Sequence, residues 1–587
     1  MFLSFKKNPF SRKNKPKEGK KRIPSFHQLK YLNEVLSLKE KNLIKLFLGC
    51  ILFSCLILFF QFYFSSSEIV PNIGGNYHEG TIGQPKNINP FLAVDEVDLS
   101  LVNLVYSGLL KYDSDFNLIP DLVQEFIYNP EQLEYEFCLK ENLFWHNEEK
   151  ITIDDILFTY TLGQNDIFKN PRLEKLKNLQ FEKTAEKCLK IKIEKNNPDI
   201  FSILTLGILP KSIWENIKPE EISQSNFNLK PIGSGPYQFN LLARDKDDKI
   251  IIYSLLRNNF YYQSSPFLKE INFHFYPDFN QAFLALKNQE INGLIIPPGQ
   301  INEQQAEIKG FKNYRLNFPY YNAVFLNLRQ SETEGKENYL TEKSIRQALS
   351  YLTPKDEIFE KVFNKQGTII NGPILPSSAF FNSEIKTYSY DPTAAENILT
   401  QAGWKKNENG FYEKNKQILE IELTTVNQSE FEKIAELIQK SWQNIGLKVK
   451  LIVIPTDKIK EVIKKRNFQA FLYGILDDFN SDPFSLWHSS QSETPGLNLT
   501  GFSFRRSDEL LEKASLTNNL EEKKINYREF QEIIANNLPA IFLYNASYSY
   551  LIDEKIKGVN INQITHPADR FNEIENWYYQ TKRKISK

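Results

Sequence analysis

The chain has 587 residues, which at about 150 residues per domain corresponds to three or four domains. Lys plus Arg and Asp plus Glu number 72 each, so the net charge is zero, which disfavours a dedicated nucleic-acid-binding protein. A hydrophobic fraction of 41% supplies large packed cores, and four cysteines are too few for a disulfide scaffold. The six histidines are scattered, with no HExxH or CxxC motif, so we expect no metal and no cofactor.

The charges are unevenly distributed along the chain. Residues 1–45 carry thirteen Lys or Arg and three acidic residues, a net charge of +10. Residues 46–64 carry no charge, and this run of 19 is close to the ~20 residues that cross a bilayer as a helix. A basic flank on one side predicts that residues 1–45 are cytoplasmic and that the rest of the chain is extracytoplasmic. We therefore predict a single-pass cell-membrane protein.

Cleavage is the alternative to an anchor, because the small residues Ser65–Ser67 could follow a signal peptide. The long basic lead and the long apolar run favour the uncleaved anchor. Cys50 and Cys55 then lie in the membrane. Cys138 and Cys188 lie in strand-like stretches outside it; they could pair, but we favour two buried free thiols.

The extracytoplasmic part is predicted to be mixed α/β. Residues 133–139 alternate apolar and polar side chains, which is typical of a half-buried strand. Thr152 and Asp155 resemble a capping box ahead of a helix. Asp391-Pro392 predicts the start of another helix, which Gly403 closes.

The clearest pattern spans residues 418–475. Apolar residues alternate around 421–423 and again over 447–453, and between them residues 431–445 have the spacing of an amphipathic helix. A short helix near 457–465 then leads to a third strand, Gln469–Ile475. Strand–helix–strand at this spacing predicts parallel strands with right-handed crossovers. In such sheets, ligands bind beyond the carboxyl ends of the strands. The segment that follows the third strand, residues 477–480, is therefore a candidate for ligand binding.

Several blocks of sequence along the extracytoplasmic part carry a family resemblance. They are Gly80–Pro90, Leu104–Asp113, Phe144–Asn147, Thr152–Phe158, Ile208–Trp214, Pro231–Tyr237, Arg257–Tyr262, Leu284–Gly293 and Ile345–Leu349. Together, and in this order, they resemble the bacterial extracellular solute-binding proteins of family 5, which are the oligopeptide- and dipeptide-binding components of ABC importers. One departure is Glu148-Glu149, where the family usually has Gly.

The resemblance implies an α/β fold with two lobes and a hinge, of the periplasmic-binding-protein type II with an extra subdomain. Carried onto this chain, the first lobe is 70–326 with an inserted subdomain at about 116–199, and the second lobe is 327–540. Residues 541–587 return to the first lobe, so the chain crosses between lobes near 326–328 and 541–548.

The resemblance also implies a ligand site between the lobes. A peptide is expected to lie enclosed there, held largely through its backbone. An acidic residue in a loop of the second lobe holds the ligand's α-amine. The stretch from Gly474 to Asn480 matches that loop, which indicates Asp478, with adjacent Asp477 as the alternative. Trp487 and Tyr544 are further candidates for the cleft, and for both the alternative is core packing.

The predicted function is that of a membrane-anchored, monomeric binding protein that passes peptides to an ABC permease. The main alternatives are a sensor or scaffold of the same fold, or a non-peptide solute such as a sugar or a metal chelate. A hydrolase is disfavoured because the sequence has no GxSxG motif, so no catalytic residue is assigned.

Overall fold

The computed structural model describes residues 36–114, 116–129, 133–193, 200–330, 337–476, 482–517 and 519–585. The chain divides into two compact units. The smaller contains the residues up to Val70 together with Thr581–Lys587, and the larger is Pro71–Gln580.

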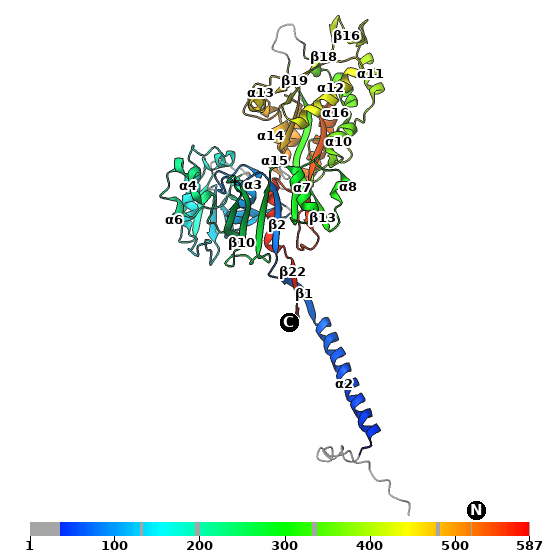
Figure 1. The fold of residues 1–587 in the computed structure, drawn as a ribbon. Coiled ribbons are helices and arrows are strands. Elements are labelled where there is room, and N and C mark those ends of the chain that lie inside the picture. The colour runs from blue at the N-terminus through cyan, green and yellow to red at the C-terminus, as the bar shows by residue number, and fades with distance from the viewer. Residues whose placement is uncertain are drawn as a thin grey trace, which may run out of the picture. The chain divides into compact units, whose positions relative to one another are not determined.

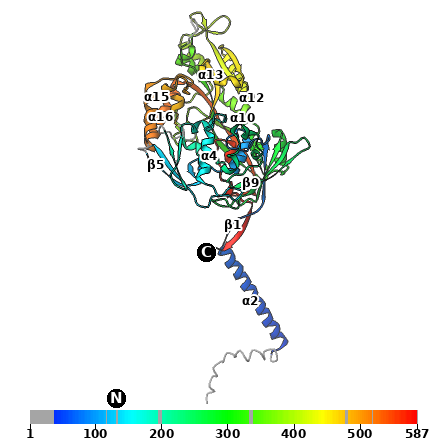
Figure 2. The same ribbon diagram turned by 90° about the vertical axis from the view of Figure 1, so that its left-hand side faces the viewer.

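The smaller unit is built on helix α2 (Leu38–Ser65), drawn in blue in Figure 2. The helix contains the whole uncharged segment 46–64 and none of its side chains is buried. By length and composition it is able to cross a membrane. Strand β1 (Ser67–Asn72) follows almost at once and pairs with the C-terminal strand β22 (Gln580–Ile585).

The larger unit contains one long mixed sheet of eleven strands. Strand β14 (Gly367–Ile369) pairs with β21 off the main path. The main path runs through β19 (Lys448–Ile454), β18 (Glu420–Val426), β20 (Ala470–Leu476), β13 (Phe311–Leu326), β21 (Ala540–Asp553), β12 (Gly293–Ile296), β2 (Asn76–Ile82), β11 (Glu270–Tyr276), β10 (Ile250–Arg257) and β9 (Tyr237–Arg244).

Two large hydrophobic cores include residues from this sheet. We call the parts of the larger unit built around them the first and second lobes, and Figure 1 shows their backbones as two bodies. The first core takes its residues from 77–316 and 550–577, and the second from 321–546. Among the strands of the described residues, only β13 and β21 contribute to both cores. Membership of the two cores does not test the lobe boundaries predicted from the sequence, which stay predictions.

The longer helices of the larger unit are α3 (Glu96–Val105), α4 (Ile153–Gly163), α7 (Phe279–Lys287), α9 (Lys343–Leu352), α10 (Lys355–Phe363), α11 (Pro392–Gln401), α12 (Ser429–Asn444), α15 (Arg505–Leu516) and α16 (Leu520–Asn537).

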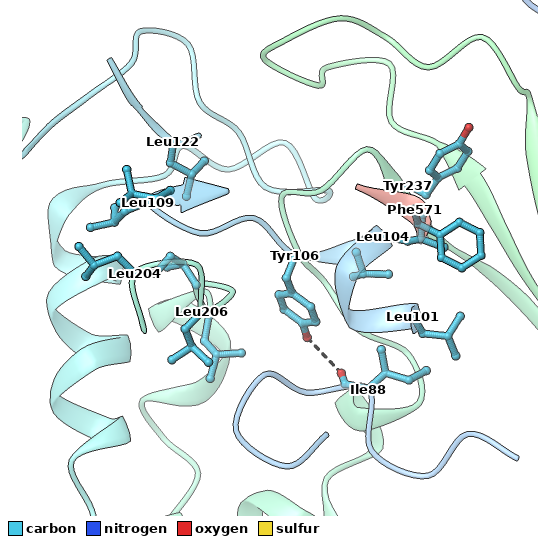
Figure 3. Close-up of a cluster of buried hydrophobic side chains, with 14 of the residues drawn as sticks. Ile88, Leu101, Leu104, Tyr106, Leu109, Leu122, Leu204, Leu206, Tyr237 and Phe571 are labelled. Atoms are coloured by element: carbon cyan, nitrogen blue, oxygen red, sulfur yellow. Dashed lines mark hydrogen bonds between the residues drawn. The ribbon is translucent and has the colours of Figure 1, made fainter. Parts of the chain in front are cut away.

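Apolar residues from distant segments meet in the first core (Figure 3). Leu101 and Leu104 of α3 lie there with Phe571 from the C-terminal part of the chain. Tyr106 is also buried, and its hydroxyl donates to the carbonyl oxygen of Ile88 at 3.4 Å. The predicted capping box begins α4, where Asp155 Oδ2 accepts from the Thr152 amide (2.8 Å) and hydroxyl (2.9 Å).

A four-stranded antiparallel sheet of the first lobe corrects one expectation. Cys138 in β6 (Glu134–Leu139) and Cys188 in β8 (Cys188–Lys192) are directly opposed and form a disulfide. Both are half-buried, so the expectation of two buried free thiols is wrong. The physical reason is register: the pairing of β6 with β8 brings their Cα atoms to 4.2 Å, within reach of a disulfide. The sheet is completed by β5 (Val123–Asn129) and β7 (Gln180–Lys183).

The second lobe contains the predicted strand–helix unit. Strands β18 and β19 are parallel, with α12 between them in sequence, and β18 is also parallel to β20. Helix α12 buries Phe431, Ile434, Ile438 and Trp442, the stripe that its spacing predicted. Helix α13 (Ile459–Lys465) leads to β20. Helix α11 begins at Asp391, whose carboxylate accepts from the amide of Ala394 at 2.9 Å. Helices α15 and α16 pack side by side (Figure 2).

The two shared strands β13 and β21 are antiparallel, but their ladder is interrupted where the cores change over. The register shifts between Asn317 and Tyr321. The side-chain amide of Asn545 donates there to the carbonyl oxygens of Phe318 (2.6 Å) and Tyr320 (2.7 Å). A side chain thus satisfies backbone groups that the ladder leaves unpaired.

Candidate functional site

A cavity of about 460 Å³ lies against the first lobe and reaches the second at Leu476. Its volume is in the range of small-ligand sites. The wall comes from segments that are distant in sequence. These are α3 and the chain after it (99–112), residues 172–175, 202–207 and 565–575, with Asp121, Tyr261 and Leu476.

One face of helix α3 is buried in the core of the first lobe, and another face lines the cavity. Leu101 and Leu104 are buried in the core, whereas Leu99, Val102 and Asn103 line the cavity. The Asn103 side chain donates to the carbonyl oxygen of Ala568 (3.1 Å) and to the side-chain oxygen of Asn572 (2.9 Å). The helix therefore holds the C-terminal wall in place.

Two carboxylates of the cavity wall already have partners. Lys111 Nζ lies 3.0 Å from Glu575 Oε1 and also donates to Gln263 Oε1 at 2.8 Å. Asp121 Oδ1 accepts from the Tyr262 hydroxyl at 2.6 Å and from Gln263 Nε2 at 2.8 Å. Burial raises the pKa of Asp121, against the opposing effect of Lys111. These groups form a fixed network that shapes the wall.

Arg172 is a cation of the wall whose side-chain hydrogen-bond partners are neutral groups, although the charge of Asp569 acts on it from a distance. It is the second residue of a short 3₁₀ helix, Pro171–Leu176, and its guanidinium donates to Thr205 Oγ1 at 2.9 Å. Among the described residues, no carboxylate lies within 4 Å of this guanidinium. An exposed guanidinium at a cavity wall can bind a carboxylate with two parallel hydrogen bonds.

The predicted amine-binding loop follows directly on a residue of this cavity. Leu476 ends β20, lies opposite Tyr320 of β13 and is exposed. Asp477 and Asp478 lie outside the described residues. Gly474 lies in β20 opposite Asn322, and a Cβ there would collide with the Tyr320 hydroxyl. Glycine is therefore needed where the Tyr320 ring crosses the strand.

The other two candidates lie in the core of the second lobe. Trp487 is 1% exposed and packs near Phe325 and Phe542, with ring centroids 6.4 and 5.7 Å away. Tyr544 is also 1% exposed, and its hydroxyl lies 3.5 Å from Glu430 Oε1. Burial, followed by the charge of Glu430, raises the Tyr544 pKa. Neither side chain is in the wall of the cavity.

Sequence reasoning did not single out Arg172. It stands in a polar stretch with several lysines, and no local pattern distinguishes it from a solvated cation. Only the approach of residues 202–207 and 565–575 gives it a place in a cavity wall.

Comparisons with known proteins cover most of the chain. Residues 117–496 match the family described as bacterial extracellular solute-binding proteins, family 5 Middle. The oligopeptide-binding protein AppA of Bacillus subtilis is 26% identical over 520 residues, covering 86% of this chain and 92% of that protein.

Two solved structures are similar in fold and sequence. The structure of AppA from Bacillus subtilis in complex with a nonapeptide has a TM-score of 0.63 at 25% identity, covering 87% of this chain and 99% of that one. The structure of NikZ from Campylobacter jejuni in complex with Ni(L-His) has a TM-score of 0.62 at 27% identity, covering 86% and 99%.

Proposed function

Because the chain belongs to family 5 of the bacterial extracellular solute-binding proteins, we propose that it captures peptides between its two lobes and delivers them to an ABC permease. Members of this family are binding proteins of transport systems and not enzymes. The observation that carries the proposal is the cavity, because its wall reaches the second lobe at Leu476, the residue that directly precedes Asp477 and Asp478 in the sequence.

The proposed roles follow from what every peptide has in common. Asp478, or Asp477 beside it, pairs with the α-amine, which all peptides with a free N-terminus carry whatever their sequence. Arg172 offers a partner for a carboxylate of the ligand. Tyr544 and Trp487 support the second lobe from within its core. Closure of the lobes about β13 and β21 excludes water, and an ion pair shielded from water is worth more than an exposed one.

The proposed cellular arrangement is a single membrane span formed by residues 46–64 of α2, with residues 1–45 in the cytoplasm and Pro71–Gln580 outside. The protein acts there as a monomer beside its permease. Protease added to intact cells should then destroy the extracytoplasmic unit and spare a short N-terminal fragment. A mature chain that begins near Glu68 would instead assign the apolar segment to a cleaved signal.

A four-member cycle tests the ligand site. Asp478→Asn keeps the shape of the side chain but removes its charge, which at an enclosed ion pair costs roughly 2–5 kcal/mol, or on the order of 30- to several-thousand-fold in affinity. An N-acetylated peptide should lose the same amount with the unchanged protein, and the two losses should not add. Calorimetry measures the affinity of both proteins for both peptides and shows whether the two losses add. If Asp478→Asn binds both peptides as the unchanged protein does, Asp477→Asn is tested in the same way.

A metal chelate is a second candidate ligand, because the similar NikZ structure holds Ni(L-His). Among the described residues, no group of three His, Cys, Asp or Glu side chains is placed to hold a metal. A bound metal would therefore arrive with its own chelator. Mass spectrometry of ligand released from the purified protein separates a peptide from a chelate.

A further inference from the structure

The C-terminal strand β22 belongs to the same unit as the apolar helix α2. Its six residues, Gln580–Ile585, are all exposed and include three consecutive cations, Lys582, Arg583 and Lys584. Beyond the C-terminal end of the helix, the described residues 66–70 and 580–585 contain one acidic residue, Glu68. None of the three cations has a carboxylate within 4 Å among the described residues.

Arg583 fixes this strand at the end of the helix. Its guanidinium lies 4.5 Å from the centroid of the Phe64 ring and donates to Ser67, at 3.4 Å to the carbonyl oxygen and 3.2 Å to Oγ. Phe64 belongs to the last turn of α2, and Ser67 begins β1. The basic strand is therefore held where the uncharged segment stops.

If α2 spans the membrane, the C-terminal end of its uncharged segment, where β22 is held, lies at the level of the lipid headgroups. The headgroup region extends only several Å beyond the hydrocarbon core, and Tyr63 and Phe64 are residues of the kind that gather at this boundary. Guanidinium and ammonium groups bind phosphate oxygens with charge-assisted hydrogen bonds. Ile585, which is 58% exposed, follows Arg583 by two residues and lies on the same strand face.

We propose that β22 is a second membrane contact of this protein, in which Lys582, Arg583 and Lys584 bind the phosphates of anionic phospholipids in the outer leaflet. This inference rests on the anchoring part of the proposed function and is independent of the ligand. Lipid is favoured over an acidic protein because Arg583 already lies against the last turn of the membrane-spanning helix.

Hydrogen exchange on the full chain in nanodiscs tests the proposal. Discs of phosphatidylcholine alone are compared with discs containing one quarter phosphatidylglycerol, at low salt and at 0.5 M salt. Exchange across 578–587 should be slower in the anionic discs, by about fivefold for each cation engaged, and the difference should vanish at high salt. Lys582→Gln/Lys584→Gln should abolish most of it while Arg583 still holds the strand. Lys555→Gln/Lys557→Gln, an exposed pair with the same spacing in the larger unit, should change nothing.

The outcomes separate the anchor from the lipid contact. Rapid exchange throughout 46–64 in both discs would overturn the anchor itself. A protected helix with equal β22 exchange in both lipids would overturn the lipid contact alone. Protection of β22 that occurs in native membranes but not in phosphatidylglycerol discs would assign the strand to a protein partner and also overturn the proposal.

Discussion

Arg570 Nε lies 2.8 Å from Glu79 Oε1, and both side chains are completely buried. The other carboxylate oxygen of Glu79 accepts from the hydroxyls of Tyr77 (2.8 Å) and Tyr550 (2.9 Å). The pair thereby joins β2, β21 and the 3₁₀ helix Pro567–Phe571, which are far apart in sequence. Ala568, Asp569 and Phe571 of that last segment line the cavity, so the buried ion pair positions the cavity wall.

Glu79→Gln should destabilise the fold strongly. It removes the nearest counter-charge of Arg570, whose side chain is completely buried, and breaking a buried pair in this way costs about 3–5 kcal/mol. Urea denaturation of the detergent-solubilised chain measures the free energy of unfolding. Glu96→Gln is the matched control, because Glu96 lies 3.7 Å from the same guanidinium but is 36% exposed. A loss below 1 kcal/mol in Glu79→Gln would contradict the structural role given to the pair.

Stability should fall as the pH drops from about 6.5 to 4. Burial lowers the pKa of His146 to about 4. Its Nδ1 accepts from the amide of Gly233 at 3.2 Å, and Nε2–H donates to the carbonyl oxygen of Gly235 at 3.1 Å. Protonation of Nδ1 breaks the first bond. A pKa lowered by folding means that the unfolded chain binds the proton more readily, so stability is lost on acidification.

His146→Gln should therefore flatten this part of the pH profile, by up to about 3 kcal/mol between pH 7 and pH 4. Some slope should remain, because burial also lowers the pKa of His274 to about 4. Thermal unfolding at pH 8, 6 and 4 provides the test. An unchanged profile in His146→Gln would rule out His146 as a source of acid sensitivity.

The disulfide should stabilise the small sheet of the first lobe. Cys138 and Cys188 are separated by 50 positions, and a cross-link over such a length restricts the unfolded chain. Cys138→Ser/Cys188→Ser should lose about 2–4 kcal/mol, measured by urea denaturation. The unchanged chain under reducing conditions should show the same loss, whereas the reductant should not affect the double variant further. Equal stability with and without reductant would contradict the bond.

Arg172→Gln should discriminate between ligands by charge. A hydrogen bond to a charged group contributes about 1.5–3 kcal/mol, so a peptide whose carboxylate reaches this guanidinium should bind roughly 10- to 100-fold more weakly. The same peptide as its C-terminal amide should bind the variant and the unchanged protein equally. Arg244→Gln, in β9, serves as a control with an exposed arginine that already has Asp248 as its partner. Equal losses for the acid and the amide would refute a carboxylate contact at Arg172.

Local patterns predicted the local structure well. The spacing over 418–475 predicted β18, α12, β19, α13 and β20, because apolar periodicity follows from which side chains each element buries. The capping residues Thr152 and Asp391 likewise begin helices, since a cap needs only a side chain and the amides two or three residues ahead.

Only the tertiary structure decided what depends on long-range pairing. The sequence-based expectation of two free thiols at Cys138 and Cys188 was wrong, because the register of β6 against β8 is set by packing across 50 positions. The sequence also contains no signal that Glu79 and Arg570, 491 positions apart, share one buried contact, or that Arg172 lies at a cavity wall. The apolar helix, the strand–helix order and the family resemblance could be read from neighbouring residues. The ion pair, the disulfide and the cavity arise where distant segments meet, and chain folding rather than local spacing determines that meeting.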